Sequence, residues 1–158
     1  MSLGQYLPNG VVMTPLFKTD EYGFYSAMAS SLCLGWAADV STFDMDHARM
    51  LTERYRQVCR FFNQDWYPLT PYSLSPEAWL GTQYHCPEDD EGILLLFRRE
   101  ACSQPSLEVS LYGLQPKALY ELVRQGQSES IKVKGSDLMN HYSITLEKKP
   151  SCLLYTSP

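Results

Sequence analysis

The sequence has few basic residues and few cysteines, and each scarcity excludes a class of function. Lys and Arg total 13 against 18 Asp and Glu, which gives a formal net charge of −5 at pH 7. Grooves that bind nucleic acid cluster Lys and Arg, so we expect no nucleic-acid partner. The 5 cysteines are widely spaced and include no C-x-x-C pair. They therefore indicate neither a disulfide framework nor a zinc site.

Long apolar segments are also missing. The longest run without charge, from Tyr22 to Ala38, is interrupted by serines and is shorter than the ~20 apolar residues of a membrane-spanning helix. The first residues show no basic start followed by an apolar core, so we expect no signal peptide. The sequence thus predicts no membrane partner.

Common catalytic and cofactor signatures are absent as well. The chain has no phosphate-binding loop, no dinucleotide-binding glycine turn, no nucleophile elbow and no zinc-protease motif. The acidic run from Glu88 to Glu91 lacks the ligand spacing of an EF-hand and predicts a solvated turn. We therefore expect no metal and no cofactor, and no residue is marked as catalytic.

The chain is long enough for a core but too short for one large fold. Its 158 residues are 44% hydrophobic, whereas a complete (β/α)8 barrel needs at least ~200 residues. Aromatic residues are abundant, with 11 Tyr, 6 Phe and 3 Trp. This composition fits short strands joined by turns.

Up to about Asp65 the pattern is helical. Apolar residues recur at spacings of three and four between Phe43 and Phe62, which predicts an amphipathic helix. Ser41 and Asp44 resemble a capping box at its start. Residues 20–29 predict a further helix.

A short apolar run from Ser31 to Trp36 lies between these two helices. It predicts a strand buried on both faces, as in parallel sheets. Such a strand followed by an amphipathic helix is one β/α unit. Because a single unit leaves its sheet incomplete, we expect further units beside it.

After Asp65 the period changes to two. Leu107, Val109 and Leu111 alternate with Glu108, Ser110 and Tyr112. The run from Ile93 to Phe97 predicts a strand buried on both faces. Turn-forming clusters separate several other short runs, which indicates an antiparallel sandwich. The other predicted strands are Trp79–His85, Leu119–Val123, Ile131–Val133, Ile144–Leu146 and Cys152–Tyr155.

Several motifs in this order resemble the C-terminal part of bacterial alpha-galactosidases of glycoside hydrolase family 36. The resemblance runs over nearly the whole chain, and it is the order and spacing of the motifs that carry it. The first part contributes Tyr6–Pro8, Tyr22–Ala29, Leu32–Trp36 and Tyr67–Ser73. The second part contributes Trp79, Glu91–Gly92, Phe97–Arg99, Gly113–Leu114, Tyr120, Gly135 and Leu138–Met139.

The resemblance implies an α+β fold: the last β/α units of a (β/α)8 barrel, followed by an antiparallel β-sandwich C-terminal domain. Residues 1–65 would be the barrel remnant and residues 66–151 the sandwich. Retaining glycosidases use two carboxylates about 5–5.5 Å apart. In this family both aspartates lie on earlier barrel strands, so no catalytic residue is expected here, and the partner of the parent enzyme would be a carbohydrate.

Two positions depart from the family pattern. The family commonly has Arg where Tyr25 stands, and Asp directly after the Trp, where this chain has Ala37 and then Asp39. Trp36 ends the predicted buried strand, where barrel enzymes collect active-site side chains. Trp36 and Asp39 are therefore the candidate substrate-binding residues, with packing of Trp36 against the next layer as the other interpretation.

Both ends of the chain suggest a fragment. Residues 152–158 resemble the translation of a sequencing adaptor, so we expect a non-native tail, and Met1 would be an internal methionine of a longer gene. Three functions remain open: part of a glycoside hydrolase that is inactive alone, a stand-alone module that binds carbohydrate through aromatics such as Trp79, or a structural domain that supports a barrel. The first is preferred.

Overall fold

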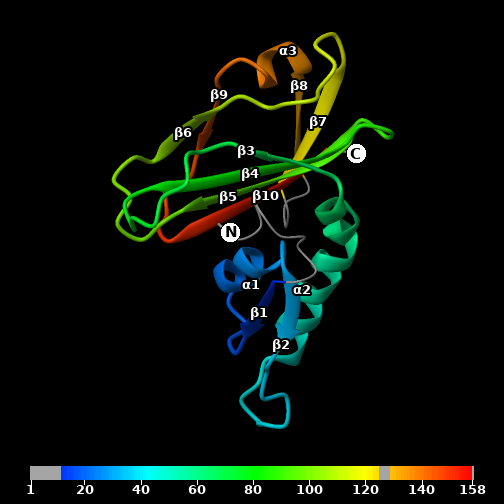
Figure 1. Cartoon of the computed structure of the whole chain (residues 1–158). Coiled ribbons are helices and arrows are strands. Elements are labelled where there is room, and N and C mark those ends of the chain that lie inside the picture. The colour runs from blue at the N-terminus through cyan, green and yellow to red at the C-terminus, as the bar shows by residue number, and fades with distance from the viewer. Residues whose placement is uncertain (1–11, 125–128, 158) are drawn as a thin grey trace. The chain divides into compact units, whose positions relative to one another are not determined.

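The computed structural model describes residues 12–124 and 129–157, the side chains of 152–157 excepted. The chain separates into two compact units, Met1–Asn63 and Gln64–Pro158 (Figure 1). We describe each unit by itself as unit 1 and unit 2. The motif Tyr6–Pro8 lies outside the described residues.

Unit 1 contains a two-stranded parallel sheet and its helices. Its elements are β1 (Met13–Leu16), α1 (Glu21–Ala27), β2 (Ser31–Leu34), α2 (Met45–Val58) and a 3-10 helix, η3 (Cys59–Asn63). β1 pairs with β2 in the register Met13 to Ser31 through Leu16 to Leu34. Strand β2, helices α1 and α2 and the parallel pairing agree with the predicted β/α organisation. Strand β1 was not predicted.

Helix α2 follows the predicted apolar stripe. Ala48, Leu51 and Val58 are buried on one face, while Arg49, Glu53 and Arg56 remain exposed. Its start differs from the prediction, because Asp44 and not Ser41 is the N-cap. The Asp44 carboxylate accepts a hydrogen bond from the His47 backbone N–H at 2.9 Å, which satisfies one of the free donors of the first turn.

Strand β2 is less buried than its apolar sequence predicts. Ser31, Leu32 and Cys33 are half-buried and Leu34 is 45% exposed. The expectation of burial on both faces is therefore wrong for this chain. The reason is that parallel strands are covered when further strands and helices surround them, and unit 1 has a sheet of two strands within its described residues.

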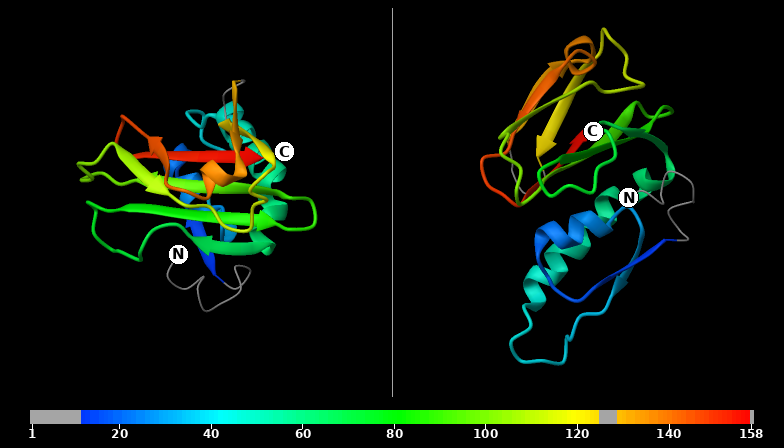
Figure 2. Two further views of the ribbon diagram at one scale, coloured as in Figure 1. Left: turned by 90° about the horizontal axis from the view of Figure 1, so that it is seen from above. Right: turned by 60° about the vertical axis from the view of Figure 1, so that its left-hand side comes forward.

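Unit 2 consists of two antiparallel sheets, which confirms the α+β class and the antiparallel prediction for this part (Figure 2). The larger sheet has six strands in the order β3-β4-β5-β10-β7-β8, and the smaller one pairs β6 with β9. The bounds are β3 (Asp65–Pro68), β4 (Trp79–Cys86), β5 (Glu91–Arg98), β6 (Ser106–Val109), β7 (Leu119–Arg124), β8 (Ser130–Lys134), α3 (Gly135–Leu138), β9 (Tyr142–Thr145) and β10 (Ser151–Ser157).

One core joins both sheets of unit 2. Its buried members come from β4, β5, β6, β7, α3, β9 and the segments that connect them. They include Trp79, Leu94, Leu96, Cys102, Val109, Leu111, Tyr120, Leu122, Leu138, Ile144 and Leu146. Leu107 packs at its margin while Glu108 is exposed, so the predicted alternation is confirmed.

The predicted strands of unit 2 are all present, and each bound lies within two residues of the predicted one. Strand β5 is buried on both faces, as expected from Ile93–Phe97. Two elements were missed, β3 and α3. β3 contains Pro68, a residue that disfavours strand interiors, but a proline is compatible with the edge position that β3 occupies.

Residues 152–157 of the expected tail form part of the larger sheet. These residues belong to β10, which pairs with β5 over its whole length and with β7 at Tyr155 and Thr156. The strand itself was predicted. The non-native origin of the tail stays a prediction, as does the division of the chain into a barrel remnant and a sandwich.

Candidate functional site

Candidate functional side chains gather at two places. The first, here called the Trp36 groove, lies in unit 1 between the segment after β2 and helix α2. The second, the His85 cavity, lies inside unit 2 between β4, the β4–β5 turn and β7. Their sizes differ by more than tenfold, at about 360 Å³ and about 20 Å³.

Trp36 is held by aromatic packing and one hydrogen bond. Its ring stacks with Phe24 at a centroid distance of 6.1 Å and lies 5.9 Å from the ring of Phe43. Its indole N–H donates to the carbonyl of Lys18 at 3.2 Å. Trp36 therefore packs against neighbouring aromatic rings, and it also forms one wall of the groove.

The opposite wall of the Trp36 groove is a polar stripe of α2. Arg49, Glu53 and Arg56 line it, and the two arginines form exposed pairs along the helix, Arg49 with Asp46 at 3.3 Å and Arg56 with Glu53 at 3.7 Å. Small-molecule sites are typically clefts of ~300–1,000 Å³ with a few convergent polar groups. The groove is thus large enough for a sugar ring.

Asp39 does not join Trp36 in this groove. It is exposed in the turn that follows Trp36, and the groove is lined by Ala38 and then Phe43. The structure therefore places the two predicted substrate-binding residues in one loop without bringing their side chains to one cavity. Neither assignment is tested by this arrangement.

Strand β2 borders a second groove, here called the β2 groove. It is lined by Leu32 and Leu34 of β2, by Phe24, and by Tyr55 and Arg56 of α2, with a volume of about 470 Å³. Its wall is mostly apolar. An apolar groove along an incomplete parallel sheet is the surface on which a further strand and helix would pack.

Tyr25, one of the two departures from the family pattern, has a structural role in unit 1. It is 4% exposed, and its hydroxyl and the Glu21 carboxylate both accept hydrogen bonds from Arg54 at 2.6 Å. Burial lowers the pKa of Arg54, but the hydrogen bonds and charges of Glu21 and Tyr25 outweigh it and raise the pKa overall. The contact fixes α1 against α2.

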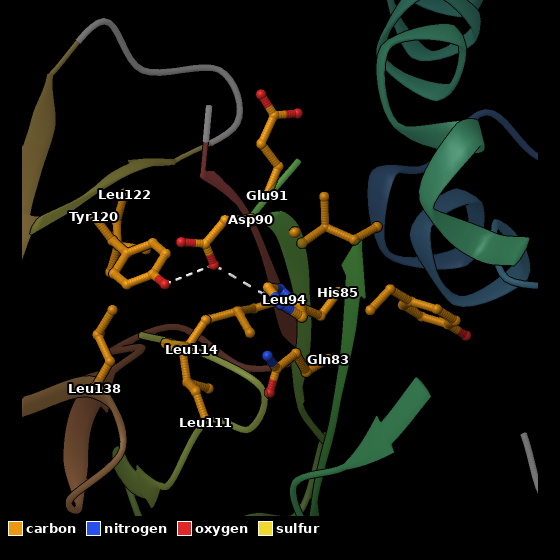
Figure 3. A pocket seen from close by; sticks show the side chains of 13 residues that line it. Gln83, His85, Asp90, Glu91, Leu94, Leu111, Leu114, Tyr120, Leu122 and Leu138 are labelled. Carbon is orange, nitrogen blue, oxygen red and sulfur yellow. Dashed lines mark hydrogen bonds and ion pairs between the residues drawn. The ribbon is translucent and has the colours of Figure 1, made fainter. Parts of the chain in front are cut away.

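The His85 cavity brings together polar residues from three segments (Figure 3). Its polar members are Gln83 and His85 of β4, Asp90 and Glu91 at the β4–β5 turn, and Tyr120 of β7. His85 is 2% exposed, and its Nε2 lies 3.9 Å from Asp90 Oδ1. A cavity of about 20 Å³ has room for one water at most, so it cannot hold a sugar.

Tyr120 connects three segments of unit 2 through its hydroxyl. The O–H donates to Asp90 Oδ1 at 2.7 Å and the oxygen accepts from the Gln115 backbone N–H at 2.8 Å. Burial and the hydrogen bond to Asp90 raise the pKa of Tyr120 from 10.0 to about 12. The network is therefore a fixed link between β7, the β4–β5 turn and the segment after β6.

Replacing Tyr120 with Phe should remove an alkaline transition. The native structure favours the neutral phenol, so this stabilisation is complete below pH 10 and is lost as the pH rises to about 12. The free energy of unfolding, measured with urea from pH 8 to pH 12, should fall above pH 10 in the native chain. It should fall less in the variant. An identical fall in both chains would contradict this role of Tyr120.

Gln83 makes a second link across the core. Its amide donates to the carbonyl of Tyr112 at 2.7 Å and accepts from the Tyr112 N–H at 2.8 Å, as a neighbouring strand would. The ring of Tyr112 stacks on that of Tyr67 at 5.3 Å. Sequence reasoning missed Gln83 and His85, although two polar residues at alternate positions of an otherwise apolar strand were a signal for buried hydrogen bonding.

Trp79, the residue expected to contact sugar in a stand-alone binding module, lies in the core of unit 2. It is 8% exposed, and its indole N–H donates to the carbonyl of Gln104 at 3.0 Å. It is therefore not accessible to a glycan. The binding-module hypothesis therefore loses the aromatic side chain that was named for it.

Two further features bear on the function class. Among the described residues, no three His, Cys, Asp or Glu side chains are grouped so that they could hold a metal ion. No helix in the described part of the chain has the length and apolar content needed to cross a bilayer.

Sequence comparison identifies no relative, since no family model and no curated protein matches the chain. Solved structures do match. The galactosidase domain of the alpha-galactosidase-sucrose kinase AgaSK superimposes with a TM-score of 0.67 at 13% identity, covering 99% of this chain and 23% of that one.

Two GH36 alpha-galactosidases of Geobacillus stearothermophilus match similarly. AgaA has a TM-score of 0.63 at 14% identity over 85% of this chain and 18% of its own. AgaB has a TM-score of 0.60 at 16% identity over 92% of this chain and 21% of its own. AgaA variants in complex with raffinose and with stachyose also match.

These matches cover most of this chain but a small share of the enzymes. The chain spans between 18% and 23% of the length of the three chains compared. At 13–16% identity the likeness concerns the fold. It confirms the resemblance predicted from the sequence motifs: this chain has the fold of one part of a GH36 alpha-galactosidase.

Proposed function

We propose that this chain is the C-terminal part of a glycoside hydrolase of the alpha-galactosidase type, which hydrolyses alpha-linked sugars with retention. Unit 1 would complete a (β/α)8 barrel and unit 2 would be the β-sandwich that follows it. The observation that carries the proposal is the fold match to GH36 enzymes over 85–99% of this chain. Under this proposal the catalytic carboxylates lie on polypeptide outside this chain, whose own role is structural apart from the sugar contacts of Trp36 and Asp39.

The surface of unit 1 supports a barrel. Its parallel sheet of β1 and β2 leaves Leu34 45% exposed and Met13 66% exposed, although parallel strands are normally covered on both faces. The β2 groove offers an apolar wall of about 470 Å³ beside that sheet. Another strand and helix of the same barrel would bury this surface.

In the complete enzyme Trp36 and Asp39 would face the sugar. Trp36 follows the carboxyl end of β2, and active sites of (β/α)8 enzymes form at this end of the strands. The Trp36 groove provides an aromatic wall and a polar rim. Asp39 is exposed in the same loop and would contact the sugar from there.

The test compares the chain alone with the product of its complete gene. We expect no hydrolysis of an aryl alpha-galactoside by the chain alone, and hydrolysis when the upstream polypeptide is present. In the complete protein, Trp36→Ala should raise KM more than Trp66→Ala, a matched tryptophan of unit 2. Turnover by the chain alone, or an upstream sequence without a carboxylate pair, would overturn the proposal.

A further inference from the structure

The two walls of the Trp36 groove come from different segments of unit 1. One wall is Trp36, which follows β2, and the other is the polar stripe of α2 that contains Arg49 and Glu53. The separation of the walls therefore depends on how the Trp36 ring is held relative to α2. A ligand between the walls is bound only if this separation matches its thickness.

The segment that contains α1 holds Trp36 at two points. The indole N–H donates to the carbonyl of Lys18 at 3.2 Å, just before Asp20, the N-cap of α1. The indole ring stacks on the ring of Phe24 with an angle of 28° between the planes, and Phe24 is 1% exposed. Because close-packed side chains transmit displacements to their neighbours, the position of Trp36 follows that of α1.

Helix α1 needs contacts outside itself to keep this position. It has 7 residues, and isolated helices shorter than ~12–15 residues are marginal in water. Its N-cap, Asp20, accepts from the Gly23 N–H at 2.7 Å, which is a contact within the helix. Burial of its apolar face keeps α1 inside unit 1, but apolar attraction has no preferred direction. A directional contact is needed to fix the helix along α2.

Arg54 of α2 makes such a directional contact. Its side chain is 15% exposed, and its Nη1 donates to Glu21 Oε1 and to the Tyr25 hydroxyl, each at 2.6 Å. The two acceptors are four positions apart and share one face of α1. Hydrogen bonds from a charged donor are short and strongly oriented. Since Phe24 precedes Tyr25 directly, a shift of α1 would move the ring that supports Trp36.

We propose that Arg54 is the positioning residue of the Trp36 groove. By holding α1 on α2 it fixes Phe24 and thereby Trp36, and so it sets the separation of the two walls. Arg54 lies outside the lining of the groove and acts through the α1 segment. The effect on sugar binding rests on the proposed function, whereas the effect on the Trp36 ring does not.

Fluorine NMR of the full chain, labelled with 5-fluorotryptophan, tests the effect on the ring. The chain has 3 Trp, and Trp36→Phe identifies the resonance of interest. We expect Arg54→Met to shift and broaden the Trp36 resonance. The resonances of Trp66 and Trp79, which belong to unit 2, should stay in place. An unchanged Trp36 resonance in the Arg54→Met chain would overturn the proposal.

Tyr25→Phe separates positioning from a loss of the fold. It removes one acceptor of Arg54 and keeps an aromatic ring at this buried position. Circular dichroism should show native helix content, and the Trp36 resonance should move in the same direction as with Arg54→Met but by less. A Trp36 resonance at its native position in the Tyr25→Phe chain would contradict the role assigned to this hydrogen bond.

Arg60→Met is the matched control for the loss of an arginine. The Arg60 guanidinium lies over the ring of Phe61 at 4.5 Å from its centroid, so its removal leaves the contact between Arg54 and α1 in place. We expect the Trp36 resonance to stay at its native position. A displacement as large as that caused by Arg54→Met would show that the resonance responds to any lost arginine and would count against the proposal.

Kinetics of the complete protein distinguish this inference from the proposed function. With an aryl alpha-galactoside, Arg54→Met should raise KM about 3- to 10-fold and keep kcat within about twofold, because it weakens binding without touching the reacting atoms. If Trp36→Ala raises KM and Arg54→Met does not, the role of Arg54 in the groove is refuted. If Arg54→Met moves the Trp36 resonance and neither variant changes KM, the positioning of Trp36 stands and the sugar contact proposed for it fails.

Discussion

Replacing Arg98 with Met should lower the free energy of unfolding of unit 2 by about 3–5 kcal/mol. Arg98 is 5% exposed, and its two terminal nitrogens donate to four backbone carbonyls, those of Leu146, Glu147, Cys102 and Ser103. These carbonyls belong to two connecting segments. Without the guanidinium these carbonyls lose their donors, and the methionine side chain has no donor to replace them.

Arg99→Met is the matched control for this loss. Arg99 is half-buried and donates to one carbonyl, that of Ser75, at 2.7 Å. Its removal should cost about 1 kcal/mol, the ordinary value for a single hydrogen bond. Urea unfolding followed by circular dichroism measures both variants. Equal losses in the two would show that the four contacts of Arg98 do not act together.

Replacing Gly135 with Ala should destabilise unit 2 by about 3 kcal/mol. A Cβ at this position would lie 2.1 Å from the carbonyl oxygen of Gln115 and 3.0 Å from a ring carbon of Tyr120. The first neighbour is backbone and cannot rotate away. The start of α3 would have to separate from the segment that Tyr120 holds through Gln115.

Gly35→Ala serves as the control for the added methyl group. Its Cβ would lie 2.9 Å from ring atoms of Phe17, which is 74% exposed and free to change its rotamer. We expect the free energy of unfolding to change by no more than about 0.5 kcal/mol. Thermal unfolding of both alanine variants checks the prediction, and a Gly135→Ala protein with the native melting temperature would refute it.

The sequence predicted those elements whose local pattern and tertiary environment agree. Helix α2 and strand β5 are examples, because the apolar stripe of one and the unbroken apolar run of the other match their burial. The capping prediction failed since Ser41 and Asp44 are both good cap residues, and spacing alone does not say which adopts the extended conformation that a cap requires. Strand β2 failed because burial depends on neighbours that its own sequence does not contain.

The residues of the candidate sites could be predicted only where local sequence indicates them, because contacts between distant segments are not encoded in local spacing. Trp36 was a candidate because it follows an apolar strand; it lines a groove, and its contact with substrate stays a prediction. The proximity of His85, Asp90 and Tyr120 depends on pairing between distant strands, which no local spacing encodes. The role of Gln83 was hidden similarly, since its partner Tyr112 lies 29 positions further along the chain.

The central position of β10 has a consequence for how unit 2 is made. β5 leaves the ribosome well before β10 is synthesised, so one edge of β5 stays unpaired while the intervening strands emerge. Open edges with apolar faces invite association with other nascent chains. The middle of the sheet is completed when β10 pairs with β5 and β7. This pairing is therefore a late and slow step of folding.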